Sequence, residues 1–160
     1  MLTEAVDELC AAAGAGASDD ELLSVLLLCE GAARRLDRLV VDTVAALQRR
    51  GSFAERGDPS TAGALGDRLG WERFEARRRV LAADQVSARV GLDGAALPAR
   101  LPATAAVFAD GRAGLRHVEV IARVLGSPTA GRLAPQVWAG AEAQRRLGGR
   151  VAIVSPKPEP

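Results

Sequence analysis

Apolar positions recur along the N-terminal third of the chain with the spacing of one face of an α-helix. From Asp19 to about Arg50 there is no proline, and alternating steps of four and three residues connect Leu22, Leu26, Cys29, Ala33, Leu36, Val40, Thr43 and Leu47. Such steps place all members on one side of a helix. Ser18 followed by Glu21 fits a capping box at the helix start. The pattern predicts one long helix, about 45–50 Å from end to end, packed along several other helices or along a second chain.

Further apolar residues lie beside this seam, at Leu23, Val25, Leu28 and Leu39. They make the apolar stripe wider than the narrow seam of a two-stranded coiled coil. The width favours a helix that forms part of a core over a free-standing zipper, and it leaves dimerisation open.

Glycine and proline divide the remaining chain into shorter helices. We expect a helix over residues 3–13 and then, after a loop ending at the cap residue Ser60, helices at about 60–69, 72–90, 102–110, 115–125 and 133–147. No alternating strand pattern of useful length appears before Val151. The chain is therefore predicted to be all-α, with a long N-terminal helix packed against several shorter helices.

Two of these helix pairs turn at a glycine and resemble helix-turn-helix units. One spans Ser60–Leu81 and turns at Gly70, and the other spans Leu101–Ala122 and turns at Gly111. In a helix-turn-helix unit the second helix reads DNA. That placement makes five arginines candidates for DNA binding: Arg73, Arg77, Arg78, Arg112 and Arg116.

The arginines after Gly70 do not form a single stripe. Arg73 and Arg77 share a helix face, whereas Arg78 and Arg79 point progressively around the helix. Glu75 precedes Arg79 by four residues, which is the spacing of an ordinary surface ion pair. Phosphate contact and a solvated helix face are therefore both open for these arginines.

Aromatic side chains are few. They make up 3% of the chain, and tyrosine is absent. Trp71 and Phe74 could stack on bases, as aromatics do in single-strand binders, but we expect both to pack in the core. Trp71 directly follows Gly70, where it would hold the turn against neighbouring helices.

Five arginines of the long helix are expected on its solvent side: Arg34, Arg35, Arg38, Arg49 and Arg50.

Composition narrows the function classes. A chain of 160 residues that is 48% hydrophobic is long enough for one core. Its net charge of +1 gives no global basic field, so attraction for nucleic acid must come from a local patch. Arginine supplies 20 of the 21 basic residues, which together with abundant alanine and glycine indicates a high-GC bacterial gene.

Residues for catalysis or metal binding are scarce. His117, the sole histidine, lies in His-Val-Glu, but the Pro-Cys-x-x-Cys pair that completes a zinc deaminase site is missing. Cys10 and Cys29 have neither metal-site nor disulfide-framework spacing, and we expect reduced thiols. No phosphate-binding glycine loop is present. We therefore expect no catalytic residue, metal ion, cofactor or small-molecule substrate.

The N-terminus argues against export. Glu4, Asp7 and Glu8 stand where a secretory signal would be positively charged. The longest apolar run, Val25–Cys29, is far shorter than a bilayer span. We expect a cytoplasmic protein without a membrane segment.

The last residues differ in composition from the rest. Gly148 and Gly149 interrupt the helical pattern, and the following residues contain the only lysine and three of the eight prolines. Residues 148–160 are therefore predicted to be a disordered tail. The alternative is a reading frame or gene interrupted near Arg145, which leaves a fragment with unrelated terminal residues.

These motifs together resemble the all-helical DUF222 domain, also called the 13E12 repeat family, of high-GC bacteria. The resemblance covers roughly residues 20–145. We therefore expect an N-terminal segment at 1–17, a DUF222-like helical domain at 18–147 and the proline-rich tail at 148–160. It rests on Arg34-Arg35-Leu36-Asp37, Gly57-Asp58-Pro59-Ser60, Leu65-Gly66-Asp67-Arg68-Leu69-Gly70, Ala76-Arg77-Arg78-Arg79-Val80, Leu101-Pro102-Ala103-Thr104, Ala109-Asp110-Gly111 and Ile121.

The resemblance implies a role beside a nuclease, because members of this family commonly carry an HNH nuclease domain after the helical region. An HNH site needs histidines and usually an asparagine, and this chain has one histidine and no asparagine. We therefore expect non-catalytic binding of duplex DNA. Two alternatives stay open: a helical interaction module that forms a homodimer through the long helix, and a truncated product without function.

Overall fold

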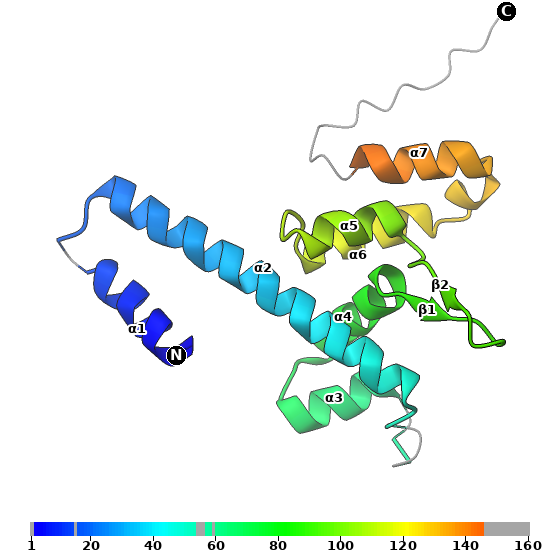
Figure 1. Cartoon of the computed structure of the whole chain (residues 1–160), viewed down its shortest axis with the longest axis horizontal. Helices are drawn as coiled ribbons and strands as arrows, with labels where there is room; N and C mark the ends of the chain where they lie inside the picture. The colour runs from blue at the N-terminus through cyan, green and yellow to red at the C-terminus, as the bar shows by residue number, and fades with distance from the viewer. Residues whose placement is uncertain (1, 15, 54–56, 59, 146–160) are drawn as a thin grey trace, which may run out of the picture.

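The computed structural model describes residues 2–14, 16–53, 57–58 and 60–145, and it confirms the all-α fold (Figure 1). The predicted tail and residues 146–147 of the last predicted helix lie outside the described residues. The helices are α1 (Leu2–Ala12), α2 (Asp19–Arg49), α3 (Thr61–Leu69), α4 (Arg73–Val86), α5 (Pro102–Ala109), α6 (Leu115–Leu125) and α7 (Pro135–Arg145).

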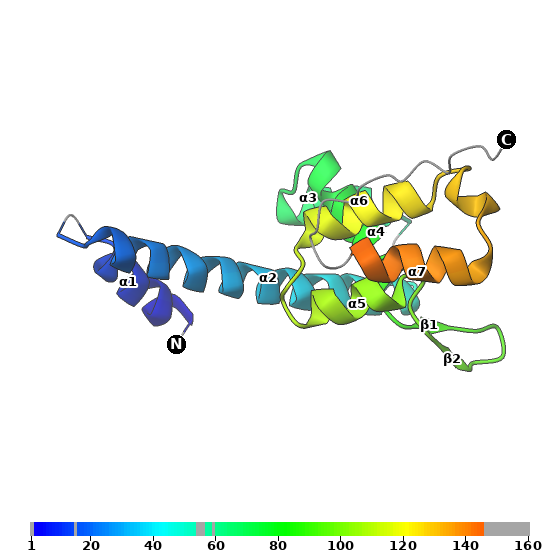
Figure 2. The same ribbon diagram turned by 90° about the horizontal axis from the view of Figure 1, so that it is seen from above.

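The long helix α2 begins as predicted. The Ser18 hydroxyl accepts a hydrogen bond from the Glu21 backbone N–H, and the Glu21 carboxylate accepts one from the Ser18 backbone N–H (2.8 Å). The Ser18 hydroxyl also donates to that carboxylate (2.8 Å), and the backbone and hydroxyl bonds that Ser18 donates lower the pKa of Glu21. The first half of α2 projects from the other helices, with α1 lying alongside it (Figures 1 and 2). We call this projection, residues 2–14 and 16–33, the arm.

The most deeply buried face of α2 lies beside the predicted seam, of which Val40 and Leu47 are partly buried against the core. Seam positions such as Leu26 and Leu36 are exposed, whereas Val41, Val44 and Ala45 are buried. At about 100° per residue, the buried stripe lies roughly a quarter turn from the seam. The helices α4 and α5 contact α2 on that stripe, towards its C-terminal half. Within this chain the seam therefore packs only towards the C-terminal end of α2, at Val40 and Leu47, and packing of its exposed part along a second chain stays a prediction.

The core is built around α4, which contacts α2, α3, α5 and α6. Ala76 and Ala83 of α4 are buried, and their small side chains let neighbouring helices approach closely. Phe108 of α5 is fully buried in the same core. A second, smaller apolar cluster joins α6 to α7 and contains Leu101, Ile121, Leu125 and Trp138.

Two helix pairs turn at glycines, as the sequence predicts. Gly70 links α3 to α4 with φ of 68°, and Gly111 lies between α5 and α6 with φ of 70°. Backbone in this left-handed region favours glycine because a β-carbon would crowd the following carbonyl oxygen. Ser60 caps α3 by accepting a hydrogen bond from the Gly63 N–H (3.0 Å).

The region after α4 differs from the prediction of one helix over 72–90. The helix ends at Val86, and a small antiparallel hairpin follows, with β1 (Arg89–Val90) paired to β2 (Ala96–Leu97). Gly94 in its turn has φ of 80°. Strands of two residues are too short to produce an alternating apolar pattern. A short 3₁₀ helix (Ala130–Arg132) precedes α7.

Candidate nucleic-acid interface

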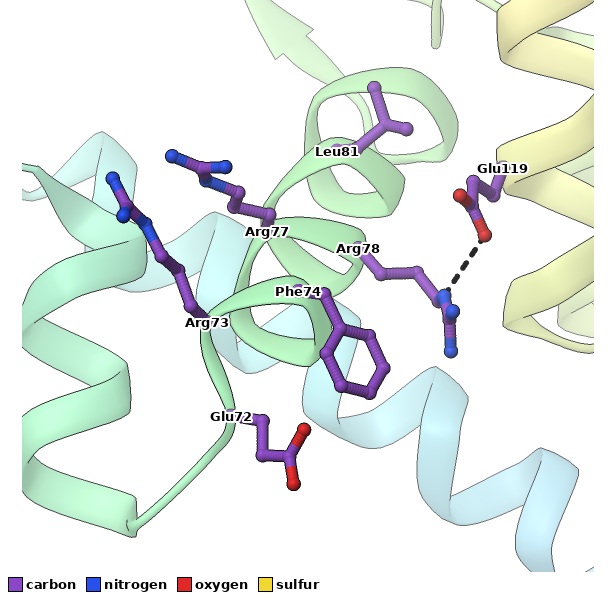
Figure 3. Close-up of a pocket in the computed structure, with 7 residues that line it drawn as sticks. All are labelled: Glu72, Arg73, Phe74, Arg77, Arg78, Leu81 and Glu119. Atoms are coloured by element: carbon purple, nitrogen blue, oxygen red, sulfur yellow. Dashed lines mark hydrogen bonds and ion pairs between the residues drawn. The ribbon is translucent and has the colours of Figure 1, made fainter.

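The first turn of α4 borders two hollows at the surface. One, of about 620 Å³, opens between α4 and α6 and is lined by Glu72, Arg73, Phe74, Arg77, Arg78, Leu81 and Glu119 (Figure 3). The other, of about 530 Å³, lies between α3 and α4 and shares Arg73 and Arg77. The N-cap residue of α4, Glu72, makes no capping hydrogen bond with its side chain. The first backbone N–H groups of α4, which like those of any helix have no intrahelical partner, therefore receive no hydrogen bond from this side chain.

Arg73 and Arg77 share one face of α4, as the helical spacing predicts. Both are exposed, and Figure 3 shows their guanidinium groups pointing to the same side, away from Glu119. Within the described residues neither forms an ion pair or a side-chain hydrogen bond. Their charge is therefore available to a ligand.

Arg78 points the other way and is held by two carboxylates. Its Nη1 donates to Glu75 (2.9 Å) and its Nε donates to Glu119 of α6 (3.0 Å; Figure 3). The predicted pair of Glu75 with Arg79 is also formed. Arg79 lies over the Trp71 ring, 4.5 Å from its centroid, and its Nη2 lies 3.7 Å from Asp37. Most of this charge is thus compensated inside the molecule.

The carboxylate of Glu119 forms ion pairs with three arginines. Besides Arg78, it accepts hydrogen bonds from Arg116 (2.8 Å) and Arg123 (2.7 Å). Burial alone would raise the pKa of Glu119, but the hydrogen bond and charge of Arg116, with those of Arg78, outweigh it and lower the pKa. Glu119 therefore stays ionised and holds these guanidinium groups in place.

The predicted DNA-binding arginines thus separate into two groups. Arg73 and Arg77 have no ion-pair partner in the described part of the chain, and Arg78 lines the same hollow with them. Arg116 joins the site only through Glu119. Arg112 lies in the turn between α5 and α6 and pairs with Asp110 (3.1 Å).

The two aromatic residues of this region behave differently. Trp71 is half-buried and packs against the core, as predicted. Phe74 is 58% exposed, so the expectation that it packs in the core is wrong. Ala76, on a different face of α4, occupies the buried position instead. The guanidinium carbon of Arg78 lies 5.5 Å from the centre of the Phe74 ring.

Arg34 was expected on the solvent side of α2, and the structure gives it a structural contact. Its Nη1 donates to the backbone oxygens of Gly111 (3.3 Å) and Arg112 (3.4 Å), and its Nε donates to Glu30. The arginine therefore ties α2 to the turn between α5 and α6. No local pattern marks this role, because the carbonyl partners lie 77 and 78 residues further along the chain.

His117 is exposed, and its Nδ1 accepts a hydrogen bond from the Gly114 N–H (3.3 Å) at the start of α6. Cys10 and Cys29 are exposed free thiols. Across the described ranges, no group of three or more histidine, cysteine or acidic residues could hold a metal ion. In the same part of the chain, no helix has the length and apolarity that crossing a membrane requires.

Comparison with known proteins adds one match. The model of a family described as a domain of unknown function, DUF222, matches residues 23–151. This span begins inside α2, so α1 lies outside it. Neither the curated proteins nor the solved structures contain a match. Because the matched span is well over half of the chain, the protein belongs to the DUF222 family.

Proposed function

We propose that this helical domain is a non-catalytic, cytoplasmic DNA-binding module that contacts the phosphates of duplex DNA through the first turn of α4. One observation carries the proposal: Arg73 and Arg77 are exposed, have no ion-pair partner among the described residues and point to the same side of the helix. An uncapped helix start adds free N–H groups and a partial positive charge beside them.

The distribution of charge along the chain supports this proposal. Residues 1–33 contain seven acidic residues and no arginine or lysine. Residues 34–160 contain all 21 basic residues and the other 13 acidic ones, a net charge of +8. The near-neutral net charge is therefore the sum of two parts of opposite sign. The basic part, residues 34–160, which we call the body, would attract DNA, and the acidic arm would repel it.

Within this proposal Arg73 and Arg77 make the main phosphate contacts, and Arg78 contributes from the same hollow. Arg116 and Arg112 are secondary, because an exposed ion pair is weak enough to be exchanged for a phosphate contact. Glu119 stays with Arg78 and fixes the orientation of its guanidinium group.

The test is fluorescence anisotropy with a labelled random duplex over a salt series. Three or four phosphate contacts give a log–log salt slope of about −3 to −4, and Arg73→Ala with Arg77→Ala should flatten it by up to about 2. A matched control replaces Arg35 and Arg132, which are also exposed and lie on α2 and in the short 3₁₀ helix. This control removes the same charge elsewhere and should leave the slope within experimental error. Absence of binding at low salt, or equal loss in both double variants, would refute the proposal.

A different observation favours pairing through α2 as a second candidate function. Leucines of the arm lie exposed close together, with Leu26 at 64% and Leu27 at 67%. The occupant that we propose is a second copy of the arm in antiparallel orientation. In that orientation the acidic start of α2, with Asp19, Asp20 and Glu21, lies near the segment of the partner that contains its first arginines.

Sedimentation velocity over a range of protein concentrations tests this pairing. The wild-type chain should shift from monomer to dimer, and Leu26→Glu with Leu27→Glu should stay monomeric. Leu92→Glu is the control, because Leu92 is fully exposed in the hairpin turn, away from the arm. A wild-type protein that remains monomeric at every concentration excludes the dimer.

A further inference from the structure

We infer that Phe74 is a stacking platform for an unpaired nucleobase, so that the site on α4 binds DNA in which a base has left the double helix. The inference rests on the proposed DNA binding and specifies which form of DNA this site prefers. It concerns a residue that the argument from phosphate contacts does not use.

Phe74 is the exception among the aromatic residues of this chain. The chain has three phenylalanines and two tryptophans, all within the described residues. Phe53 is 7% exposed and Phe108 is fully buried, and Trp71 and Trp138 are half-buried against the two core clusters. Phe74 alone exposes more than half of its surface. Its ring contributes little to the core and is free to contact a ligand.

The surroundings of the ring match a base-stacking site. Phe74 and Leu81 give the hollow between α4 and α6 apolar surface, and Arg73 and Arg77 stand on the same helix at the edge of that hollow (Figure 3). Proteins that bind single strands combine such cations for the backbone with an aromatic face for the base. A base stacked on Phe74 would therefore lie in a hollow that Arg73 and Arg77 also line.

Arg78 covers one face of the Phe74 ring. Its guanidinium carbon lies 5.5 Å from the ring centre, and the carboxylates of Glu75 and Glu119 hold it there. A cation over an aromatic ring is favourable, and with this side taken a base would stack on the other face of the ring. Glu119 then acts as a positioning residue for the platform, because it fixes Arg78 and not the base.

The experiment compares three labelled probes: a single strand of oligothymidine, a perfect duplex, and a duplex with one unpaired central base. The variants are Phe74→Ala, Phe74→Leu, which keeps apolar volume without an aromatic face, and Phe74→Trp, which restores the face. Leu69→Ala is the matched control, since Leu69 on α3 is 54% exposed. Far-UV circular dichroism verifies that each variant is folded.

We expect Phe74→Ala and Phe74→Leu to weaken binding of the single strand by about 5- to 150-fold, the range for loss of one base–aromatic stack. The salt slope should stay unchanged, because no phosphate contact is removed. Phe74→Trp and Leu69→Ala should bind like the wild type. If the duplex with the unpaired base shows the same dependence on Phe74, the base comes from a distorted duplex; if only the oligothymidine shows it, the source is a single strand.

The outcomes separate this inference from the proposed function. If Phe74→Ala binds every probe as the wild type does while the Arg73 and Arg77 double variant loses binding, the platform is refuted and DNA binding stands. Equal weakening of all three probes by Phe74→Ala also refutes it, because a perfect duplex offers no unpaired base. If the double arginine variant binds normally, the proposed function itself falls.

Discussion

Replacement of Glu142 should destabilise the domain far more than its place on the last described helix suggests. The side chain is 2% exposed and lies at the start of α5. Its Oε1 accepts hydrogen bonds from the backbone N–H of Thr104 (2.8 Å) and from the Thr104 hydroxyl (2.9 Å). Leu101 at the N-cap position of α5 makes no side-chain hydrogen bond. Glu142 therefore caps α5 from another helix.

The expected magnitude follows from the groups that Glu142→Ala would strand. Thr104 is 1% exposed, so its N–H and hydroxyl would lose their acceptor in a buried place. Each stranded group costs about 1–3 kcal/mol, and because water can enter the space of the lost side chain we expect a total of about 2–4 kcal/mol. Glu142→Gln keeps an acceptor oxygen but loses its charge, which should cost about 1 kcal/mol.

Urea unfolding, followed by circular dichroism, measures these free energies. Gln144→Ala is the control, because Gln144 is exposed on the same helix and the change should alter stability by less than about 0.5 kcal/mol. Hydrogen exchange at the Thr104 amide adds a local measure, since its protection depends on this one acceptor. A Glu142→Ala protein as stable as the Gln144→Ala protein would refute the role of the cap.

Two further predictions concern the cluster around Arg79 and the turn before α4. Burial raises the pKa of Asp37 more than the charge of Arg79 lowers it, so the folded state holds this proton more tightly than the unfolded state. That contribution to stability is present below the unfolded pKa and is lost as pH rises through the folded pKa. Asp37→Asn removes the ionised carboxyl, so it should raise the urea midpoint at pH 7 and raise it by less at pH 4. An equal change at both pH values would contradict the burial argument. Gly70→Ala should cost about 1–2 kcal/mol from its left-handed backbone alone, because no atom lies within 4 Å of an added β-carbon. Gly31→Ala, in the middle of α2 with equal space, should instead stabilise by about 0.5–1 kcal/mol; equal effects of the two changes in urea unfolding would show that backbone conformation is not the cause.

Those parts of the fold that rest on neighbouring residues could be predicted from the sequence. The capping box at Ser18, the cap at Ser60 and the glycine turn at Gly70 each depend on residues within one helical turn. The packing face of α2 could not be predicted in the same way. Apolar residues lie on several sides of that helix, and only contacts with α4 and α5 decide which of them is buried.

In the candidate site, too, features that depend on neighbouring residues could be predicted, and features that depend on contacts between distant residues could not. Helical spacing places Arg73 and Arg77 on one face, and the structure agrees. The pairing of Arg78 with Glu119 joins residues 41 apart, so no local pattern indicates that this arginine is largely compensated. Phe74 was expected in the core because aromatic residues make up only 3% of the chain, and the alanines of α4 fill the core positions that it would have needed.

The two proposed activities would use surfaces of opposite charge. The arm carries the exposed leucines together with seven carboxylates, and the first turn of α4 lies on the body, which has the excess of arginine. A duplex drawn to the body is repelled by the arm, so DNA and a second copy would not compete for one surface. Pairing through the arms would then place two copies of the α4 site in one particle. Such a dimer would bind a long duplex more tightly than a short one through effective concentration alone, whereas Leu26→Glu with Leu27→Glu would remove this dependence on length and leave the affinity for a short duplex unchanged.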